Sequence, residues 1–154
     1  MQALFKFIFK HKDIIKNAAL YLRRHYLTPR RMWPFRIFLH LINQPDSDRD
    51  PHNHPWGFFT VILWGGYWEA IYKTDEQIRG LANPTMKHWG MFSFGWRPAS
   101  HVHQVVSLSK PTWTLVFAAP ASRGWGFWLP SGEFVPEAKY LGREDAPVAE
   151  EDRI

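Results

Sequence analysis

Cysteine is absent from this 154-residue sequence. The absence excludes disulfides, thiolate metal sites, iron–sulfur clusters and a cysteine nucleophile, so any metal ligands must be His, Asp or Glu. No run reaches the ~18 apolar residues of a membrane span, and charges interrupt the apolar residues at the start, which is not typical of a signal peptide. We therefore expect a cytoplasmic protein. A phosphate-binding Gly-x-x-x-x-Gly-Lys loop and a Gly-x-Ser-x-Gly nucleophile elbow are missing as well.

Aromatic residues, in contrast, are abundant. They make up 17% of the chain, with Trp 9, Phe 12 and Tyr 5, so large rings are expected to fill the core. The hydrophobic fraction of 45% and the charged fraction of 21% are ordinary for a folded protein and exclude global disorder. The length fits one domain with a single core.

The positive charge is concentrated at one end. Residues 1–36 hold nine Lys/Arg against one acid, a net of +8, whereas residues 133–154 hold seven acids against three bases, a net of −4. The basic character belongs to the first segment and does not mark the whole protein as a binder of polyanions.

Apolar residues recur at helical spacing over residues 3–27 and include Leu4, Ile8, Ile15 and Leu22. This pattern predicts a basic amphipathic helix over residues 1–28, packed on the rest of the protein and ended by the following proline. The alternative is that this segment contacts an anionic membrane surface or nucleic acid.

Beyond Pro34 the pattern changes to short β-branched and aromatic runs separated by Gly, Pro, Asn and Ser. Such spacing is typical of a β-sandwich or barrel, here over residues 29–141, followed by an acidic flexible tail over 142–154. The expected strands are 35–42, 57–63, 66–72, 89–95, 102–108, 112–118, 125–129 and 134–140.

Two histidine pairs carry the chemistry of the sequence. The pairs His52/His54 and His101/His103 both have i, i+2 spacing, which places two imidazoles on one face of an extended chain. Prolines flank the first pair and restrict it to extended geometry. Two such pairs meeting inside a barrel offer three or four nitrogen ligands, a set that suits Fe, Zn, Ni, Cu or Mn.

These segments resemble the two signature motifs of the cupin superfamily. The first cupin motif reads His-x-His, three or four residues, Glu, six residues, Gly; here His52 and His54 are followed at the shorter spacing by Phe58 and Gly65. The second motif contains Pro-x-Gly-x-x-His, which residues 98–103 match apart from a serine in place of glycine. The resemblance implies an all-β, double-stranded β-helix (jelly-roll) barrel.

The resemblance also implies the metal ligands His52, His54 and His103; the alternative is that these histidines form hydrogen bonds in a polar pocket without metal. Because Phe58 stands where the motif has Glu, the set resembles the three-histidine site of cysteine-dioxygenase-type cupins. The segment is similar as well to uncharacterised bacterial and phage cupin-like proteins with a His-x-His-Pro-Trp signature, a likeness that gives no reaction.

Four further residues are candidates for catalytic roles. His101 is a fourth ligand or a proton relay beside His103, with a solvated position on the barrel rim as the alternative. Arg97 either binds a substrate carboxylate or phosphate or is a surface arginine. Tyr67 and Glu69, two residues apart, are either acid/base or orienting groups or, as the favoured alternative, a cross-strand surface pair.

Other polar and aromatic residues have simpler interpretations. His40 is expected to be an inward, hydrogen-bonded histidine, and the acidic loop that contains Asp46, Asp48 and Asp50 to be solvated. Trp113, Trp125 and Trp128 are expected to fill the core or cover the open end of the barrel, with a stacking platform for a base or sugar as the alternative.

Together these features predict a mononuclear non-haem iron(II) enzyme, dioxygenase-like, that activates O2 and acts on a small molecule. One alternative is a catalytically silent cupin that binds a small ligand or a protein partner. A further alternative is a Zn- or Ni-dependent isomerase, and Mn also fits the ligand set. The cupin resemblance implies a homodimer.

Overall fold

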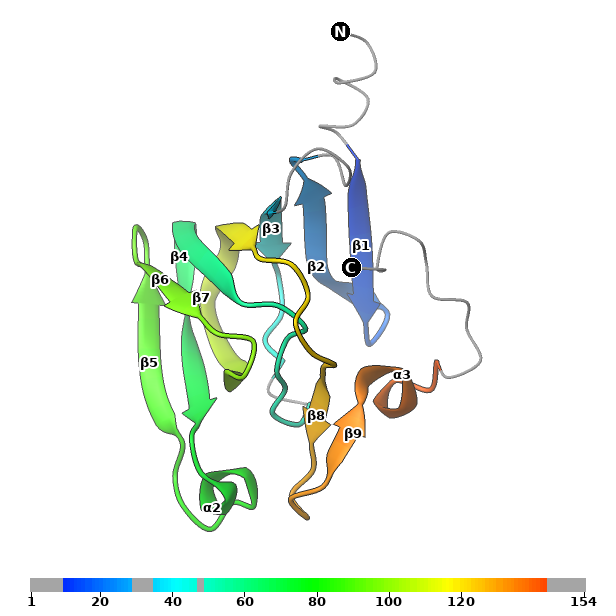
Figure 1. The fold of residues 1–154 in the computed structure, drawn as a ribbon. Helices are drawn as coiled ribbons and strands as arrows, with labels where there is room; N and C mark the ends of the chain where they lie inside the picture. Colours follow the sequence, from blue (N-terminus) through cyan, green and yellow to red (C-terminus); the bar gives the residue numbers. More distant parts are fainter. Residues whose placement is uncertain (1–9, 29–34, 47–48, 144–154) are drawn as a thin grey trace, which may run out of the picture.

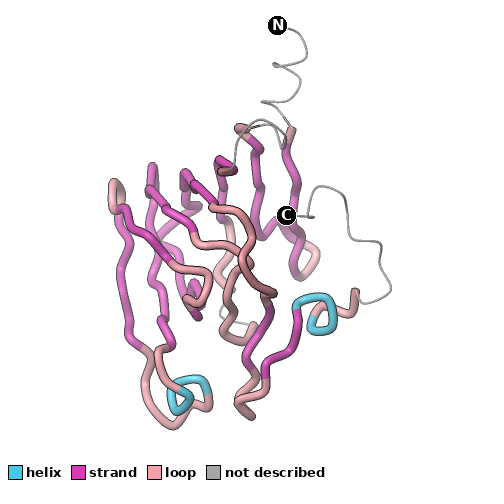
Figure 2. The backbone as a smooth tube through the Cα atoms, in the orientation of Figure 1, coloured by secondary structure: helices cyan, strands magenta, loops and turns pink. Residues whose placement is uncertain are grey.

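In a computed structural model, residues 10–28, 35–46 and 49–143 are described (Figure 1). Strands account for most of the ordered backbone, and the two helices are single turns at its periphery (Figure 2). The elements, in chain order, are β1 (His11–Lys16), β2 (Ala19–Tyr26), β3 (Arg36–Ile42), β4 (Phe58–Tyr72), α2 (Asp75–Ile78), β5 (Thr85–Gly90), β6 (Phe94–Arg97), β7 (Val102–Ala118), β8 (Gly126–Trp128), β9 (Phe134–Pro136) and α3 (Glu137–Tyr140).

The long antiparallel strands β4 and β7 pair with each other and organise the sheet. Their register shifts between Ile62 and Glu69, a stretch that includes Gly65 with a left-handed φ of 82° and the non-donating Pro111 opposite. Bulges of this kind bend and twist a strand pair. The pair therefore contributes to two half-sheets.

The large half-sheet comprises β1, β2, β3, the C-terminal half of β7, the N-terminal half of β4 and β6, all antiparallel. The small half-sheet comprises the other halves of β7 and β4, together with β5. The separate β8–β9 hairpin is linked to β7 through His52, which forms isolated bridges to both His103 and Phe127. The sheets do not close into a full barrel over the described ranges.

Two apolar clusters fill the space that the strands enclose. The first gathers the buried residues Tyr26, Phe38, Trp56, Val116 and Ala118, with Phe58 packed against it. The second gathers Ile62, Tyr67 and Trp89 in the region of the bend. The aromatic core expected from composition is therefore present.

The predicted amphipathic helix over residues 1–28 is wrong where the chain is described. Residues 11–26 form the β1–β2 hairpin instead, and residues 1–9 lie outside the described ranges. Asn17 and Ala18 both have left-handed φ values, 52° and 60°, which match the tight hairpin turns of antiparallel strands. The buried Leu22 and Tyr26 are four residues apart, a spacing that shares one face in a helix and in a strand alike, so the sequence pattern did not distinguish the two.

The other strand predictions differ mainly in their boundaries. The runs 57–63 and 66–72 are one bent strand, β4, and 102–108 and 112–118 are one strand, β7. The run 89–95 is divided between β5 and β6 by a turn in which Phe92 has a φ of 64°. The run 134–140 is a short strand followed by α3, and most of the predicted tail over 142–154 lies outside the described ranges.

Within the described ranges, no helix has the length and apolar character needed to cross a bilayer.

A substitution in the β1–β2 turn distinguishes a hairpin from a helix, because the two predict opposite changes in the free energy of unfolding. Ala18→Gly is expected to raise the free energy of unfolding by about 1 kcal/mol, because glycine adopts the left-handed conformation without steric cost. A glycine inside a helix would instead lower it by about 1 kcal/mol. Urea unfolding measures the change; Ala19→Gly, in the extended strand, is the control and should not stabilise.

Candidate metal centre

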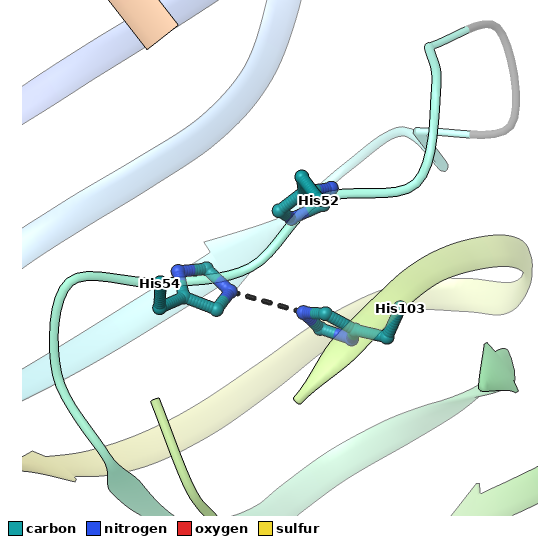
Figure 3. A group of neighbouring side chains, drawn as sticks. All are labelled: His52, His54 and His103. Atoms are coloured by element: carbon teal, nitrogen blue, oxygen red, sulfur yellow. Dashed lines mark hydrogen bonds between the residues drawn. The ribbon is translucent and has the colours of Figure 1, made fainter. Parts of the chain in front are cut away.

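His52 and His54 lie in an extended segment that backbone hydrogen bonds hold against β7. The amide of His52 donates to the carbonyl of His103 over 3.1 Å, and the amide of His103 donates back to the carbonyl of His52 over 2.9 Å. Pro51 and Pro55 flank the segment and keep it extended. The first histidine pair is thereby brought beside His103, as Figure 3 shows.

The residue between the two histidines anchors the segment on its other side. Asn53 is 1% exposed. Its side-chain oxygen Oδ1 accepts a hydrogen bond from the backbone amide of Gly126 over 3.0 Å, and its backbone amide donates to the Gly126 carbonyl over 3.2 Å. A buried, fully engaged asparagine between His52 and His54 fixes the chain on which both rings are carried.

The three rings of His52, His54 and His103 converge. Nε2 of His54 lies 3.0 Å from Nε2 of His103, and the ring centroids of His52 and His103 are 4.9 Å apart. One nitrogen from each ring lies within 4.8 Å of the other two. The sequence-predicted ligand set is therefore one cluster in space.

All three imidazoles are kept neutral. Burial lowers the pKa of His52 and His54 well below the usual value, and the neighbouring His103 lowers both further. Burial also lowers the pKa of His103, although Glu69 opposes this shift. Neutral imidazole nitrogens with available lone pairs are the form that binds a metal.

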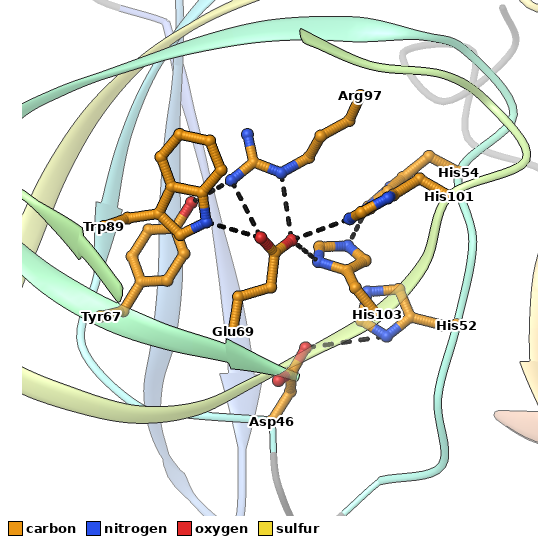
Figure 4. Close-up of polar contacts among 9 residues, drawn as sticks. All are labelled: Asp46, His52, His54, Tyr67, Glu69, Trp89, Arg97, His101 and His103. Carbon is orange, nitrogen blue, oxygen red and sulfur yellow. Dashed lines mark hydrogen bonds and ion pairs between the residues drawn. The ribbon is translucent and has the colours of Figure 1, made fainter. Parts of the chain in front are cut away.

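A carboxylate, Glu69 on β4, occupies the centre of the polar network behind the histidines (Figure 4). It is 0% exposed, and one oxygen lies 2.6 Å from Nδ1 of His103. Trp89 Nε1 donates to the other oxygen over 2.6 Å, and Arg97 Nε donates to the first over 3.0 Å. Residues from four different strands or loops thus meet at one side chain.

Glu69 is ionised despite its burial. Burial alone would raise its pKa, but hydrogen bonds from His101 and His103, together with the charge of Arg97, lower the pKa far below the ordinary value. A buried carboxylate is stable only when it is paired in this manner.

Arg97 is not a surface residue, so that alternative is wrong. It is 2% exposed, its guanidinium lies 4.1 Å from the Trp89 ring centroid, and it pairs with Glu69. Its second terminal nitrogen donates to the Tyr67 hydroxyl over 3.0 Å. Tyr67 and Glu69 are both buried, so the cross-strand surface pair is also wrong, although the two do share one face.

His101 lies at the edge of the same network. Its Nε2 is 3.1 Å from Glu69 Oε1, and its side chain is 16% exposed, more than those of His103 or Glu69. With Glu69 and His103 it forms a second group of three ligand-type side chains. His101 thus lies between the buried carboxylate and the solvent.

Asp46 is the second acid beside the histidines. It is 2% exposed, its carboxylate lies 3.7 Å from Nδ1 of His52, and burial raises its pKa to about 7. The expectation of a solvated loop is therefore wrong for Asp46, while Asp48 lies outside the described ranges. A carboxyl group at Nδ1 leaves Nε2 of His52 for other contacts.

The remaining predicted residues lie around this centre or apart from it. Arg24 donates to Nε2 of His40 over 3.1 Å, and burial lowers the pKa of His40 well below its usual value, as expected for a satisfied inward histidine. Trp125 stacks on His54 with the rings 14° from parallel. Trp113 stacks on His25, and Trp128 contacts Phe134.

Comparison with known proteins bears on the fold. No protein-family profile and no curated sequence matches the chain. Among solved structures, the polyketide cyclase RemF from Streptomyces resistomycificus aligns with a TM-score of 0.56 at 15% identity, covering 85% of this chain and 84% of RemF. KdgF from Halomonas sp. aligns with a TM-score of 0.52 at 10% identity, covering 73% and 89%.

A third similar structure is FeII HppE, with a TM-score of 0.54 and 9% identity over 71% of this chain. The chain spans 55% of the length of HppE. The fold is of the cupin type. At these identities the likeness concerns the fold alone, so the chemistry of this cupin-type protein has to be argued from its own residues.

The central position of Glu69 in this network could not be predicted from the sequence, which favoured a surface pair with Tyr67 over a role as an acid/base or orienting group. Glu69 lies eleven positions beyond the place where the cupin motif has its acid, and the bend in β4 brings it to His103. One signal was available in the sequence. Glu69 and Tyr67 are two residues apart in a largely apolar strand, so they share one face, and this pattern indicates that the face is directed inward. The partner of Glu69, Trp89, carried no signal in the sequence.

The paired charges yield a stability prediction. Glu69→Gln should lower the free energy of unfolding by about 3–5 kcal/mol, because it leaves the buried Arg97 uncompensated. The folded-state pKa of Glu69 is depressed, so its stabilisation is present above the unfolded value of 4.5 and is lost as pH falls below it.

Denaturant unfolding between pH 3 and 7 checks both effects, with the exposed Glu133→Gln as control. The variant at 69 should lose part of the acid sensitivity that the control retains. Equal stabilities of the two variants at neutral pH would contradict the buried ion pair.

Proposed function

We propose that the protein is a metal-dependent enzyme of the cupin type that acts on a small molecule, with His52, His54 and His103 as the ligands of a divalent ion. The observation that carries the proposal is the convergence of three neutral imidazoles, one of them backed by a buried, ionised carboxylate. Imidazole sets of this type suit iron, zinc, nickel and copper.

The contacts of His103 favour this ligand set over the group of Glu69, His101 and His103. Glu69 is already engaged by Trp89, Arg97 and His101. His103 directs Nδ1 toward Glu69 and Nε2 toward His54. A metal-ligating histidine ordinarily uses one nitrogen for the metal and the other for a carboxylate, which fixes its tautomer and orientation.

The surroundings of His54 are suited to chemistry that must be kept from water. Its ring centroid lies 5.0 Å from those of Trp56 and Phe58, and Trp125 stacks on it. Such an apolar wall lowers the local dielectric and limits access of water. We therefore take iron(II) as the first candidate, since a bound iron(II) with open coordination positions supplies O2 activation.

The protein's own residues supply positioning and proton handling. Arg97 and Trp89 hold Glu69 ionised and fixed, and Glu69 in turn orients His103. His101 directs Nε2 to the same carboxylate and is partly open to solvent, so it is placed to give or accept a proton at its other ring nitrogen, Nδ1. Arg97 acts as a positioning residue in this proposal, since its guanidinium is engaged by Glu69 and Tyr67.

The His101–Glu69 contact also favours a second candidate, a lyase- or isomerase-type reaction. A divalent ion held by His52, His54 and His103 would supply Lewis-acid chemistry for that reaction, and His101 would transfer the proton, with no need for O2. Zinc, nickel or manganese would serve it as well as iron.

Metal analysis tests the ligand set. Natively purified protein should contain about one metal per chain, and His52→Ala, His54→Ala and His103→Ala should each remove it or weaken its binding at least tenfold. The matched control is His88→Ala, whose imidazole is exposed on β5. Stoichiometric metal in all three ligand variants would reject the site.

A separate variant distinguishes the two overlapping groups. His101→Ala should retain the metal if His52, His54 and His103 are the ligands, and should lose it if Glu69, His101 and His103 are. Circular dichroism of each variant establishes that it is folded.

Oxygen consumption separates the two candidate reactions. Iron(II) is restored under anaerobic conditions, and a panel of small molecules is then screened with an oxygen electrode and, in parallel, without O2. Turnover only with O2 uptake supports the oxygenase, and turnover without O2 supports the proton-transfer reaction. Metal-loaded protein without turnover under either condition would leave the ligand-binding alternative.

A further inference from the structure

The chain that carries His52 and His54 is held from two sides. Its residues 50–54 are called the ligand segment below. On one side, His52 forms a backbone bridge to His103 of β7, and on the other side it forms a second bridge to Phe127 of β8. The ligand segment therefore lies between the large strand pair and the hairpin that follows it in the chain.

The hairpin side of this arrangement is one unit made of β8, β9 and α3, called the C-terminal unit. The two strands pair with each other, and α3 packs against both. The Glu137 amide, at the start of α3, donates to the Trp125 carbonyl over 3.2 Å. Figure 1 shows the three elements side by side. The position of α3 is thus determined by β8, the strand that borders the ligand segment.

Tyr140, the last residue of α3, reaches back to the ligand segment. Its hydroxyl accepts a hydrogen bond from the Asp50 amide over 3.1 Å and donates one to the Asp50 carboxyl oxygen Oδ2 over 3.0 Å. Burial raises the pKa of the Tyr140 hydroxyl, which therefore keeps the proton that the donated bond needs. Asp50 lies two residues before His52, so a side chain 90 positions away in the sequence ties down the start of the ligand segment.

The ring of Tyr140 supports His52 by a second route. It stacks on Phe127 with the ring centroids 3.8 Å apart and the planes 15° from parallel. Phe127 is 2% exposed, and its ring centroid lies 5.6 Å from that of His52. Tyr140 therefore contacts both the start of the ligand segment and the ring that packs against His52.

These contacts complement the other supports of the histidine cluster. Asp46 contacts the ring of His52 at Nδ1, whereas Tyr140 acts on the backbone that carries this ring. His103, across the cluster, is held by β7 and by Glu69. A site binds a metal tightly only when each ligand is held in its bonding position by surrounding contacts.

We propose that Tyr140 is a positioning residue of the metal centre, which acts through Asp50 and Phe127 to set the place of His52 relative to His103. The inference rests on the proposed function, in which His52 is a metal ligand. It extends that function to the C-terminal unit, because α3 contributes to metal affinity through the chain that it holds and not through a ligand of its own.

A double-mutant cycle on metal affinity tests the proposal. Tyr140→Phe keeps the ring stack and removes both hydrogen bonds to Asp50, and it should raise the dissociation constant for Co2+ by about tenfold. Asp50→Ala removes the carboxyl acceptor and should raise the constant by about threefold. The double variant should bind no more than ~2-fold more weakly than Tyr140→Phe, because both changes act on one contact. Asp50→Asn keeps an acceptor oxygen and should bind nearly as tightly as the wild type.

The matched control is Tyr26→Phe. It removes a buried hydroxyl that has no hydrogen-bond partner within the described ranges, and it should leave the dissociation constant unchanged. The visible absorption of bound Co2+ supplies a readout that a purely structural role would not change, because the bands report the coordination geometry. The bands should shift in Tyr140→Phe and match the wild type in the control. Circular dichroism and the melting temperature establish that each variant is folded.

The outcomes separate this inference from the proposed function. If Tyr140→Phe binds Co2+ as tightly as the wild type and with the same spectrum, the inference is overturned and the proposed function stands. A lower melting temperature at unchanged affinity would likewise contradict it, because Tyr140 would then serve folding alone. Additive losses in the double variant would contradict the route through Asp50. A wild type that binds no metal would overturn the proposed function and this inference together.

Discussion

A single buried charge pair, Glu69 with Arg97, holds the interior of this protein in register. The carboxylate on β4 is contacted by Arg97 at the end of β6, by Trp89 of β5, by His101 just before β7 and by His103 in β7. An unpaired ion in this position would be very costly, so the strands can adopt their arrangement only together with the pair. The two apolar clusters stabilise the fold through packing that does not depend on direction. The ion pair, in contrast, requires a particular side chain from each strand.

The sequence predicted the centre well where its signal was local. The i, i+2 spacing of His52 and His54, fixed by neighbouring prolines, is independent of the rest of the fold, and their meeting with His103 followed from the resemblance to known motifs. The β-rich class and the aromatic core were likewise readable from short alternating runs. Apart from the meeting with His103, each of these features depends on residues that are close together in the chain.

The failures involve information that is not local. Leu22 and Tyr26 fit a helix and a strand equally well, and only the pairing of β2 with β3 decides between them. The importance of Glu69 depends on a bend in β4 and on partners up to 34 positions away, such as His103. Arg97 was assigned to substrate or solvent because its buried counter-ion could not be identified without the fold.

The three histidines rest on supports of different kinds, and this bears on how such a site can evolve. His103 is tied through Glu69 to the packing of four strands, so a change there disturbs the whole interior. His52 and His54 lie on a connecting segment secured through its backbone and through Asn53, contacts that do not depend on which side chain occupies either position. In the proposed metal site, replacements that alter metal preference should therefore accumulate first at positions 52 and 54, where the fold tolerates other side chains, while position 103 stays fixed.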